Sequence, residues 1–278
     1  MPTFATPAPI AATVEVAGAR VRVTASDRTD TVVLVEPINE ASHSDVKVAG
    51  KTEVDLAGDQ LSVKTTTPGN KSGSVAITIG LPAGSSLAAY LAHSSVQVDG
   101  PVGQCELQLV SGQVQLDRID ALQASIASGE VAIGHIAGRA NVDGGAFTMR
   151  IGEVKDTVGF SSSGGQAWLG HAFADLDLSS GSGNFDIDRA DASITATTAS
   201  GAIRVGRMTN GQAKLINGSG NIEVGIGVDT AASIDATSER GAVHDFVSSQ
   251  GNAGPADHQV MVHARTRHGD IVIQRAAS

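Results

Sequence analysis

From Gly112 to the C-terminus the chain repeats a short apolar quartet led by a glycine, and most quartets alternate apolar and polar positions. Such alternation is typical of a β-strand with one buried face. The leading glycines are Gly112, Gly129, Gly145, Gly165, Gly183, Gly201, Gly220, Gly241 and Gly269. Successive glycines lie 16 to 21 residues apart, except for a last interval of 28. A repeat of this length predicts the stacked coils of a parallel β-solenoid.

Each coil is predicted to hold two short strands. The quartet after the glycine forms one strand, and a second apolar segment before the next glycine forms the other, as in residues 122–127 and 193–198. Equivalent strands of neighbouring coils then pair in parallel at about 4.8 Å. The glycines follow serines such as Ser111 and Ser200, where a positive φ lets the chain turn between two sheets.

Residues 13–80 lack the glycine-led repeat and instead alternate in shorter bursts, which predict antiparallel strands. The bursts begin near Thr13, Arg20, Thr31, Asp45, Thr52, Gln60 and Ser74. Gly18 and Gly58 mark tight connections, whereas the segments after Pro37 and Pro68 are interpreted as longer loops. No segment shows ten or more residues of helical period, so we expect almost no helix.

The predicted fold class is therefore all-β: a parallel β-solenoid, with about 18 residues and two short strands per coil, capped by an N-terminal antiparallel β region. The predicted domains are an antiparallel cap over 1–80 and a solenoid repeat domain over 81–278, with an inserted loop near 248–257. An uncovered end coil leaves backbone groups unpaired. We expect the cap to cover one end and the coil that contains Ile271 to form the other, either short and charged or paired with a second copy.

Composition narrows the functional classes. The chain has 278 residues, of which 41% are hydrophobic, enough for a core in one large or two smaller domains. A formal charge of −10, from 19 Lys and Arg against 29 Asp and Glu, argues against nucleic-acid binding. Cys105 is the single cysteine and has no disulfide partner. The first ten residues lack the features of a secretion signal and no apolar run reaches about 20 residues, so we expect a cytoplasmic protein without a membrane span.

The order of these parts resembles a large bacterial family of β-strand-repeat proteins of unknown function, known as a "putative adhesin" domain, and especially its actinobacterial branch. The matching parts are the N-terminal strands, the transition over 77–86, the recurrent Ser-Gly or Asn-Gly before a quartet, Val205-Gly-Arg-Met, and the closing segment from Ala264. The resemblance implies a repeat fold and no assigned activity. The adhesin name implies a surface role, which the absence of a signal segment disfavours.

A solenoid converts sequence spacing into columns in space. The residue two places after the last apolar position of a quartet is charged or a histidine in six coils: Arg118, His135, Glu153, His171, Arg189 and Arg207. Neighbours in this coil-edge column would lie about 5 Å apart. Its members from His135 to Arg207 are our candidate anion-binding or partner-binding column, with Arg189 and Arg207 as the anion ligands. A metal at His135, Glu153 and His171 is a weaker alternative because ligands along one line make no tetrahedron. Solvated turn positions that simply favour polar residues are the third interpretation.

Acidic residues between Asp175 and Asp191 raise two further alternatives. The five carboxylates are Asp175, Asp177, Asp186, Asp188 and Asp191. They could attract calcium, but the spacing departs from the glycine-aspartate nonapeptide pattern. Paired acids also cleave polysaccharides in some β-helix enzymes, with carboxyl groups about 5–9 Å apart. Trp168 is the single tryptophan, and we expect it to pack against a sheet rather than to form a sugar platform.

The remaining motifs do not assemble a catalytic set. The histidines near the C-terminus are His244, His258, His263 and His268, and their spacing matches no zinc motif. Nucleotide-binding glycine loops and a serine-hydrolase elbow are absent from the sequence. We therefore predict a non-enzymatic scaffold or protein-binding solenoid without cofactor or metal, which binds a protein or a second copy. A carbohydrate-active or carbohydrate-binding β-helix protein and a surface adhesin remain the alternatives.

Overall fold

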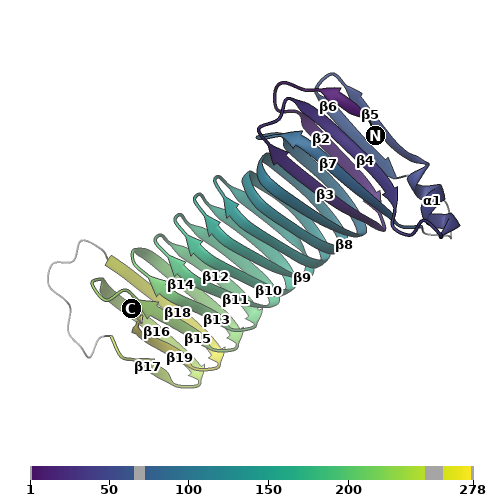
Figure 1. The fold of residues 1–278 in the computed structure, drawn as a ribbon. Coiled ribbons are helices and arrows are strands. Elements are labelled where there is room, and N and C mark those ends of the chain that lie inside the picture. Colours follow the sequence, from purple (N-terminus) through teal and green to yellow (C-terminus); the bar gives the residue numbers. More distant parts are fainter. Residues whose placement is uncertain (1, 66–72, 248–258, 277–278) are drawn as a thin grey trace. The chain divides into compact units, whose positions relative to one another are not determined.

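The computed structural model describes residues 2–65, 73–247 and 259–276. It contains two compact units, Met1–Ala137 and Gly138–Ser278. Both units consist almost entirely of β-strands (Figure 1). The predicted division near residue 80 follows a change in sequence pattern and stays a prediction. The predicted loops after Pro68 and near 248–257 lie largely outside the described residues.

The described residues of the first unit form eight strands and one helix. Their bounds are β1 (Thr3–Ala5), β2 (Ala11–Ala17), β3 (Ala19–Ser26), β4 (Asp30–Pro37), α1 (His43–Ala49), β5 (Thr52–Ala57), β6 (Gln60–Thr65), β7 (Val75–Pro82) and β8 (Ser86–Ile136). Three pairs are antiparallel, namely β1 with β4, β4 with β7, and β5 with β6. These pairs confirm the antiparallel N-terminal region.

Two N-terminal strands differ from the expectation, because β2 and β3 pair in parallel. Both pair with β8, from Ala11 opposite Ser86 to Thr24 opposite Asp99, and they also pair in parallel with β6 and β7. Gly18, with φ +66°, turns the chain between β2 and β3. The turn therefore leads from one coil strand to the next instead of closing a hairpin, and parallel stacking begins near residue 11.

The strand predicted at Asp45 is wrong, because this segment forms the helix α1. The Ser42 hydroxyl caps the helix by accepting a hydrogen bond from the Asp45 backbone N–H at 3.4 Å. Asp45 lies in the first turn and Lys47 in the last, as the helix dipole favours. The helix has seven residues, too few for a sequence period to reveal it.

The second unit contains the regular coils. Its strands are β9 (Ala140–Val154), β10 (Val158–Ala172), β11 (Leu176–Ala190), β12 (Ile194–Ser200), β13 (Ile203–Met208), β14 (Gly211–Ser219), β15 (Ile222–Ile226), β16 (Ala231–Arg240), β17 (Val243–Asp245), β18 (Gln259–His268) and β19 (Ile271–Arg275). Each coil supplies one segment to each of two parallel ladders, and the long strand β11, for example, pairs with β12 in one and with β13 in the other.

Parallel register confirms the predicted solenoid. Val158 of β10 lies opposite Ala140 of β9 and Leu176 of β11, an offset of 18 residues in each direction. The register also corrects one predicted position: the residue opposite Gly165 is Phe147 and not Gly145. Phe147 is buried and its ring lies 5.4 Å from that of Phe160, so this coil places an aromatic side chain where its neighbours have glycine.

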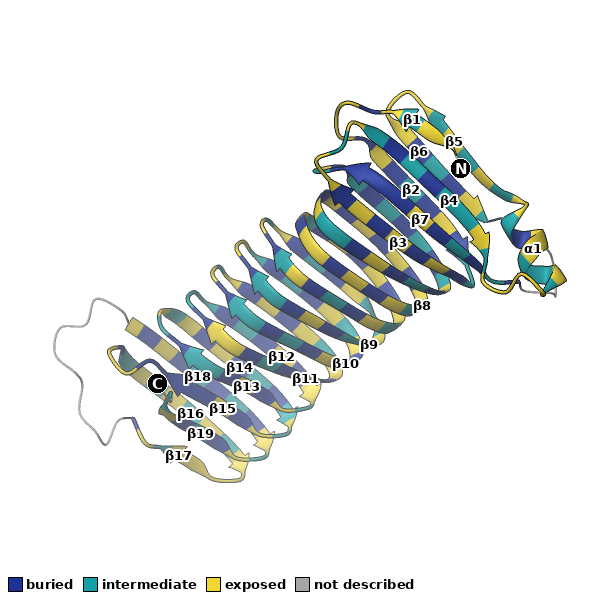
Figure 2. Cartoon of the chain, viewed as in Figure 1, coloured by how far each residue is buried: buried dark blue, intermediate teal, exposed yellow. Residues whose placement is uncertain are grey.

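The core consists of inward-facing aliphatic side chains that alternate with outward polar ones. Figure 2 shows this alternation as stripes along the coils. Along β11, for example, Phe185 and Ile187 are buried while Asp186 and Asp188 reach the outer face. Trp168 lies between two buried positions and is itself half-buried, so it too belongs to the outer face.

The last two coils do not follow chain order. Strand β18 pairs with β14 on one side and with β16 on the other, and β19 likewise pairs with β15 and β17. The coil of β18 and β19 is thus inserted between two coils that precede it in sequence (Figure 1). The expectation that Ile271 ends the stack is wrong: among the described strands β16 and β17 form the end coil, because they pair on the outer side of β18 and β19 although they precede them in sequence.

Candidate functional site

The coil-edge column exists within the second unit. His171 lies opposite Glu153 on one side and Arg189 on the other, and Arg189 lies opposite Arg207. The 18-residue period therefore places these four predicted residues in neighbouring coils. Arg118 and His135, the other two predicted members, belong to the first unit.

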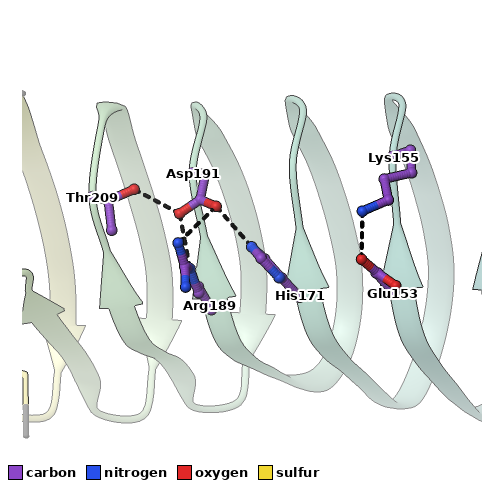
Figure 3. Close-up of polar contacts among 6 residues, drawn as sticks. All are labelled: Glu153, Lys155, His171, Arg189, Asp191 and Thr209. Carbon is purple, nitrogen blue, oxygen red and sulfur yellow. Dashed lines mark hydrogen bonds and ion pairs between the residues drawn. The ribbon is translucent and has the colours of Figure 1, made fainter. Parts of the chain in front are cut away.

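A second column, two residues further along each coil, supplies the partners of the first. It consists of Lys155, Phe173, Asp191 and Thr209, which recur at intervals of 18. Asp191 is the centre of the resulting network (Figure 3). It accepts hydrogen bonds from His171 Nε2 at 2.7 Å, from Thr209 Oγ1 at 2.6 Å, and from Arg189 Nε and Nη2 at 3.0 and 3.1 Å.

The network fixes the ionisation of Asp191. Burial alone would raise the pKa of this carboxyl, but hydrogen bonds from Arg189, Thr209 and His171 outweigh that effect and lower the pKa to about 2. The side chains of Asp191 and His171 are only 22% and 25% exposed. This carboxylate therefore joins three coils and is ionised at neutral pH.

Next to this network, Lys155 and Glu153 form an ion pair at 2.5 Å (Figure 3). Lys155 Nζ also lies 3.4 Å from the centre of the Phe173 ring, a cation–π contact. The ring of Phe173 in turn lies 3.8 Å from that of His171. The coil edge is thus a continuous strip of paired charges and rings, in which most charged groups satisfy one another.

The acidic residues between Asp175 and Asp191 do not converge. Asp175 accepts the backbone N–H of Ser193, whereas Asp186 and Asp188 both pair with Arg204, at 2.6 and 3.3 Å. The described residues contain no group of three or more side chains placed to hold a metal ion. These contacts give no support to the calcium alternative.

The C-terminal histidines likewise make separate contacts. His263 Nδ1 lies 3.0 Å from Asp235 Oδ2, and the His244 ring stacks on Phe246 with centroids 6.2 Å apart. His258 lies outside the described residues. In the described ranges no helix has the length and hydropathy needed to cross a bilayer.

These features define a β-solenoid repeat protein with a polar coil edge. Its sequence matches the profile of the family described as Toastrack DUF4097 over residues 12–274, and the chain belongs to that family. The predicted resemblance to an uncharacterised β-repeat family is thereby confirmed. A search of curated proteins finds no match.

Several solved structures align along nearly the whole chain at low identity. A "putative adhesin" from Parabacteroides merdae is 10% identical with a TM-score of 0.44, over 98% of this chain and 94% of that one. A "putative adhesin" from Bacteroides fragilis is 11% identical with a TM-score of 0.39, over 98% and 95%. A "putative lipid binding protein" from Parabacteroides distasonis is 11% identical with a TM-score of 0.38, over 99% and 96%.

Proposed function

We propose that this chain is a non-enzymatic scaffold whose binding surface is the open end coil of the second unit, formed by β16 and β17, and that the partner at this surface is a second copy. The observation that carries the proposal is an uncovered core. Val243 of β17 lies opposite Ile271, which lies opposite Ile222. The two isoleucines are fully buried, but Val243 is 41% exposed.

The same end coil presents an open backbone edge. Strand β16 has ten residues and pairs with β18; no other described strand pairs with it. Its core positions Ile234 and Ala236 are only half-buried, whereas their partners Val262 and Ala264 are buried. Unpaired backbone groups beside uncovered apolar side chains favour the addition of further strands.

A second copy fits this end because β16 and β17 must be covered together. The end coil of another copy has the same shape and can cover both strands at once. The edge strands of the first unit are less suited to pairing. β1 has three residues, and β5 has six with Glu53 and Asp55 exposed. Contact between two identical end coils is self-complementary, so it gives a closed dimer instead of a fibre.

Light scattering coupled to size-exclusion chromatography tests the proposal on the full chain. We expect a dimer that Val243→Asp converts to a monomer, because the contact would bury the new carboxylate without a partner. Thr237→Lys on β16 should act similarly by placing like charges across the contact. Matched controls are Val110→Asp, at a valine 57% exposed in the first unit, and Thr197→Lys, at an exposed threonine on the interior strand β12. A wild-type monomer at every concentration would refute the proposal, as would a Val243→Asp variant that remains dimeric.

The carbohydrate-active alternative receives no support from the acidic residues. Asp177 lies on the part of β11 that pairs with β12, while Asp186 lies on the part that pairs with β13. Asp186 and Asp188 share the guanidinium of Arg204. A glycosidase instead needs two carboxyl groups that flank one glycosidic bond, one of them free to donate a proton.

We propose that the scaffold is cytoplasmic and belongs to the actinobacterial branch of the family, which the order of its sequence parts resembles. The surface-adhesin alternative requires export. Fractionation of the native cells, followed by immunodetection of this chain, distinguishes the two locations.

A further inference from the structure

A second feature of the coil edge, independent of the open end, involves Arg207. Its neighbour in the column, Arg189, has its charge matched by Asp191 through two hydrogen bonds. Arg207 has no such partner: its Nε is buried, and none of the described residues accepts a hydrogen bond from it. A buried guanidinium N–H without an acceptor is unfavourable, so an acceptor from outside the described residues would stabilise this side chain.

Arg207 lies where the regular register breaks. Val205 pairs with Val224 and Met208 with Ile226, so two residues of β13 oppose one residue of β15. The residue opposite this β-bulge is Gly225, where a Cβ would lie 1.9 Å from the Gly206 carbonyl oxygen. A Cβ at Gly206 would likewise lie 2.8 Å from the Asp188 carbonyl oxygen, so neither glycine beside Arg207 has room for a side chain against the neighbouring coil. Bulges of this kind often redirect a side chain at a functional site.

The result is a cavity of about 450 Å³ beside the bulge. Its lining includes Arg189, Arg204, Arg207, Glu223, Gly225 and Gln274. This volume lies within the range of small-molecule sites, roughly 300–1,000 Å³. The lining therefore combines three guanidiniums, the carboxylates of Asp188 and Glu223, and one amide around a space large enough for one sugar ring.

The charges of the lining single out Arg207. Arg204 is matched by Asp186 and Asp188, and Arg189 by Asp191, so both guanidiniums already have carboxylate partners. Glu223, also in the lining, adds a negative charge and disfavours ligands with two negative charges. The site thus has one cationic donor group to offer, which matches a singly charged anion.

We propose that this cavity binds an organic monocarboxylate, held by Arg207 through the parallel hydrogen bonds that a guanidinium forms with a planar carboxylate. The Gln274 side chain supplies a neutral polar group for a hydroxyl next to the carboxylate. The ligand class is therefore a hydroxy acid or sugar acid of about one ring. Of the two anion ligands that the sequence predicted in the coil-edge column, Arg189 and Arg207, this proposal keeps only Arg207, because Arg189 is already paired with Asp191.

Isothermal titration of the full chain with sodium glucuronate tests the proposal, with glucose and inorganic phosphate as comparison probes. We expect binding of glucuronate, no binding of glucose and weaker binding of phosphate. Lactate in a separate titration distinguishes a small hydroxy acid from a sugar acid. Arg207→Gln should weaken glucuronate binding about tenfold or more, which corresponds to the loss of about one charge-assisted contact. Arg207→Lys keeps the positive charge but not the two parallel N–H donors of a guanidinium. Its affinity for glucuronate should therefore lie between those of the wild type and Arg207→Gln.

The matched control is Arg118→Gln, at an exposed column position of the first unit, which should leave binding unchanged. Circular dichroism and thermal unfolding establish that each variant is folded. Equal affinity of the wild type and Arg207→Gln for glucuronate would overturn the proposal. So would the absence of glucuronate binding at about 100 mM, which is 100-fold the Kd of a weak site of about 1 mM. Phosphate binding as tight as glucuronate binding would show that the site does not select a planar carboxylate. Because dimerisation depends on Val243 and not on Arg207, the two proposals can fail separately.

Discussion

His171 and Asp191 are 20 residues apart in sequence, yet His171 Nε2 lies 2.7 Å from Asp191 Oδ2. The contact crosses from one coil to the next, as does the hydrogen bond from Thr209 to the same carboxylate. In a solenoid each coil contacts only its neighbours, so such side-chain bridges add to the backbone pairing between coils. Asp191 therefore links its own coil to both neighbouring coils.

Replacing Asp191 by asparagine should destabilise the second unit. The pKa of Asp191 falls from 3.8 to about 2 on folding. That shift corresponds to about 2 kcal/mol of stability at neutral pH. Because the folded-state pKa is the lower one, this contribution is present above about pH 4 and is lost as pH falls toward 2. Denaturant unfolding of Asp191→Asn at pH 7 should show the loss.

The control is Asp143→Asn, at an exposed aspartate on β9. This variant should unfold like the wild type at pH 7 and retain the same decline in stability between pH 4 and pH 2. Asp191→Asn should show a shallower decline across that interval. Equal stability of the two variants at pH 7 would contradict the assigned role of the Asp191 network.

The fold was predictable because two signals agree along most of the chain. Alternation within a quartet sets the strand, and recurrence near 18 residues sets the stack, so the residues opposite His171 could be named from spacing alone. The residues of the second column could not be predicted from the spacing. Lys155, Phe173, Asp191 and Thr209 differ in charge and polarity, so their common position carries no chemical signature in the sequence.

The stacking order of the last coils could not be predicted from the sequence either. The quartets after Gly241 and Gly269 have the same glycine-led form, and backbone pairing is indifferent to which of them stacks on β15. The choice depends on burial. The quartet after Gly269 offers Ile271 and Ile273, which are fully buried, whereas that after Gly241 offers Val243 and the polar Asp245. Chain order suggested the opposite arrangement.

Gly201→Ala should destabilise the second unit more than Gly58→Ala destabilises the first. Both glycines have positive φ, +149° and +66°, so alanine is strained at each. A Cβ at Gly201 would also lie 2.1 Å from the Gly183 carbonyl oxygen of the preceding coil, while a Cβ at Gly58 meets nothing within 4 Å. We expect a loss of about 1 kcal/mol at Gly58 and about 3 kcal/mol or more at Gly201. Thermal and denaturant unfolding measure the two losses, and equal losses would show that coil contact at the glycine column is unimportant.

Ending the chain after Val247 should unfold the end coil while leaving the interior coils intact. The truncation removes β18 and β19, which are the described pairing partners of β16 and β17. Hydrogen exchange should then be fast for the amides of β16 and remain slow for those of β10, since stability in a stack is set by nearest neighbours. In the full chain, the amides of β16 that donate to β18 should be protected. Retained protection of β16 in the truncated chain would mean that this coil stacks directly on β14.

Cys105 should resist thiol reagents until the first unit opens. The side chain is 3% exposed, and burial, reinforced by the nearby Glu106 carboxylate, raises its pKa to about 12. Since the thiolate is the reactive form, both access and ionisation oppose reaction at pH 8. Ellman's reagent should therefore release almost no colour from the native protein and one equivalent in denaturant. A Ser125→Cys variant, at an exposed position of the same strand β8, should add one rapidly reacting thiol and leave Cys105 protected. Rapid reaction of Cys105 in the native wild type would show that the core of this unit opens on the timescale of the assay.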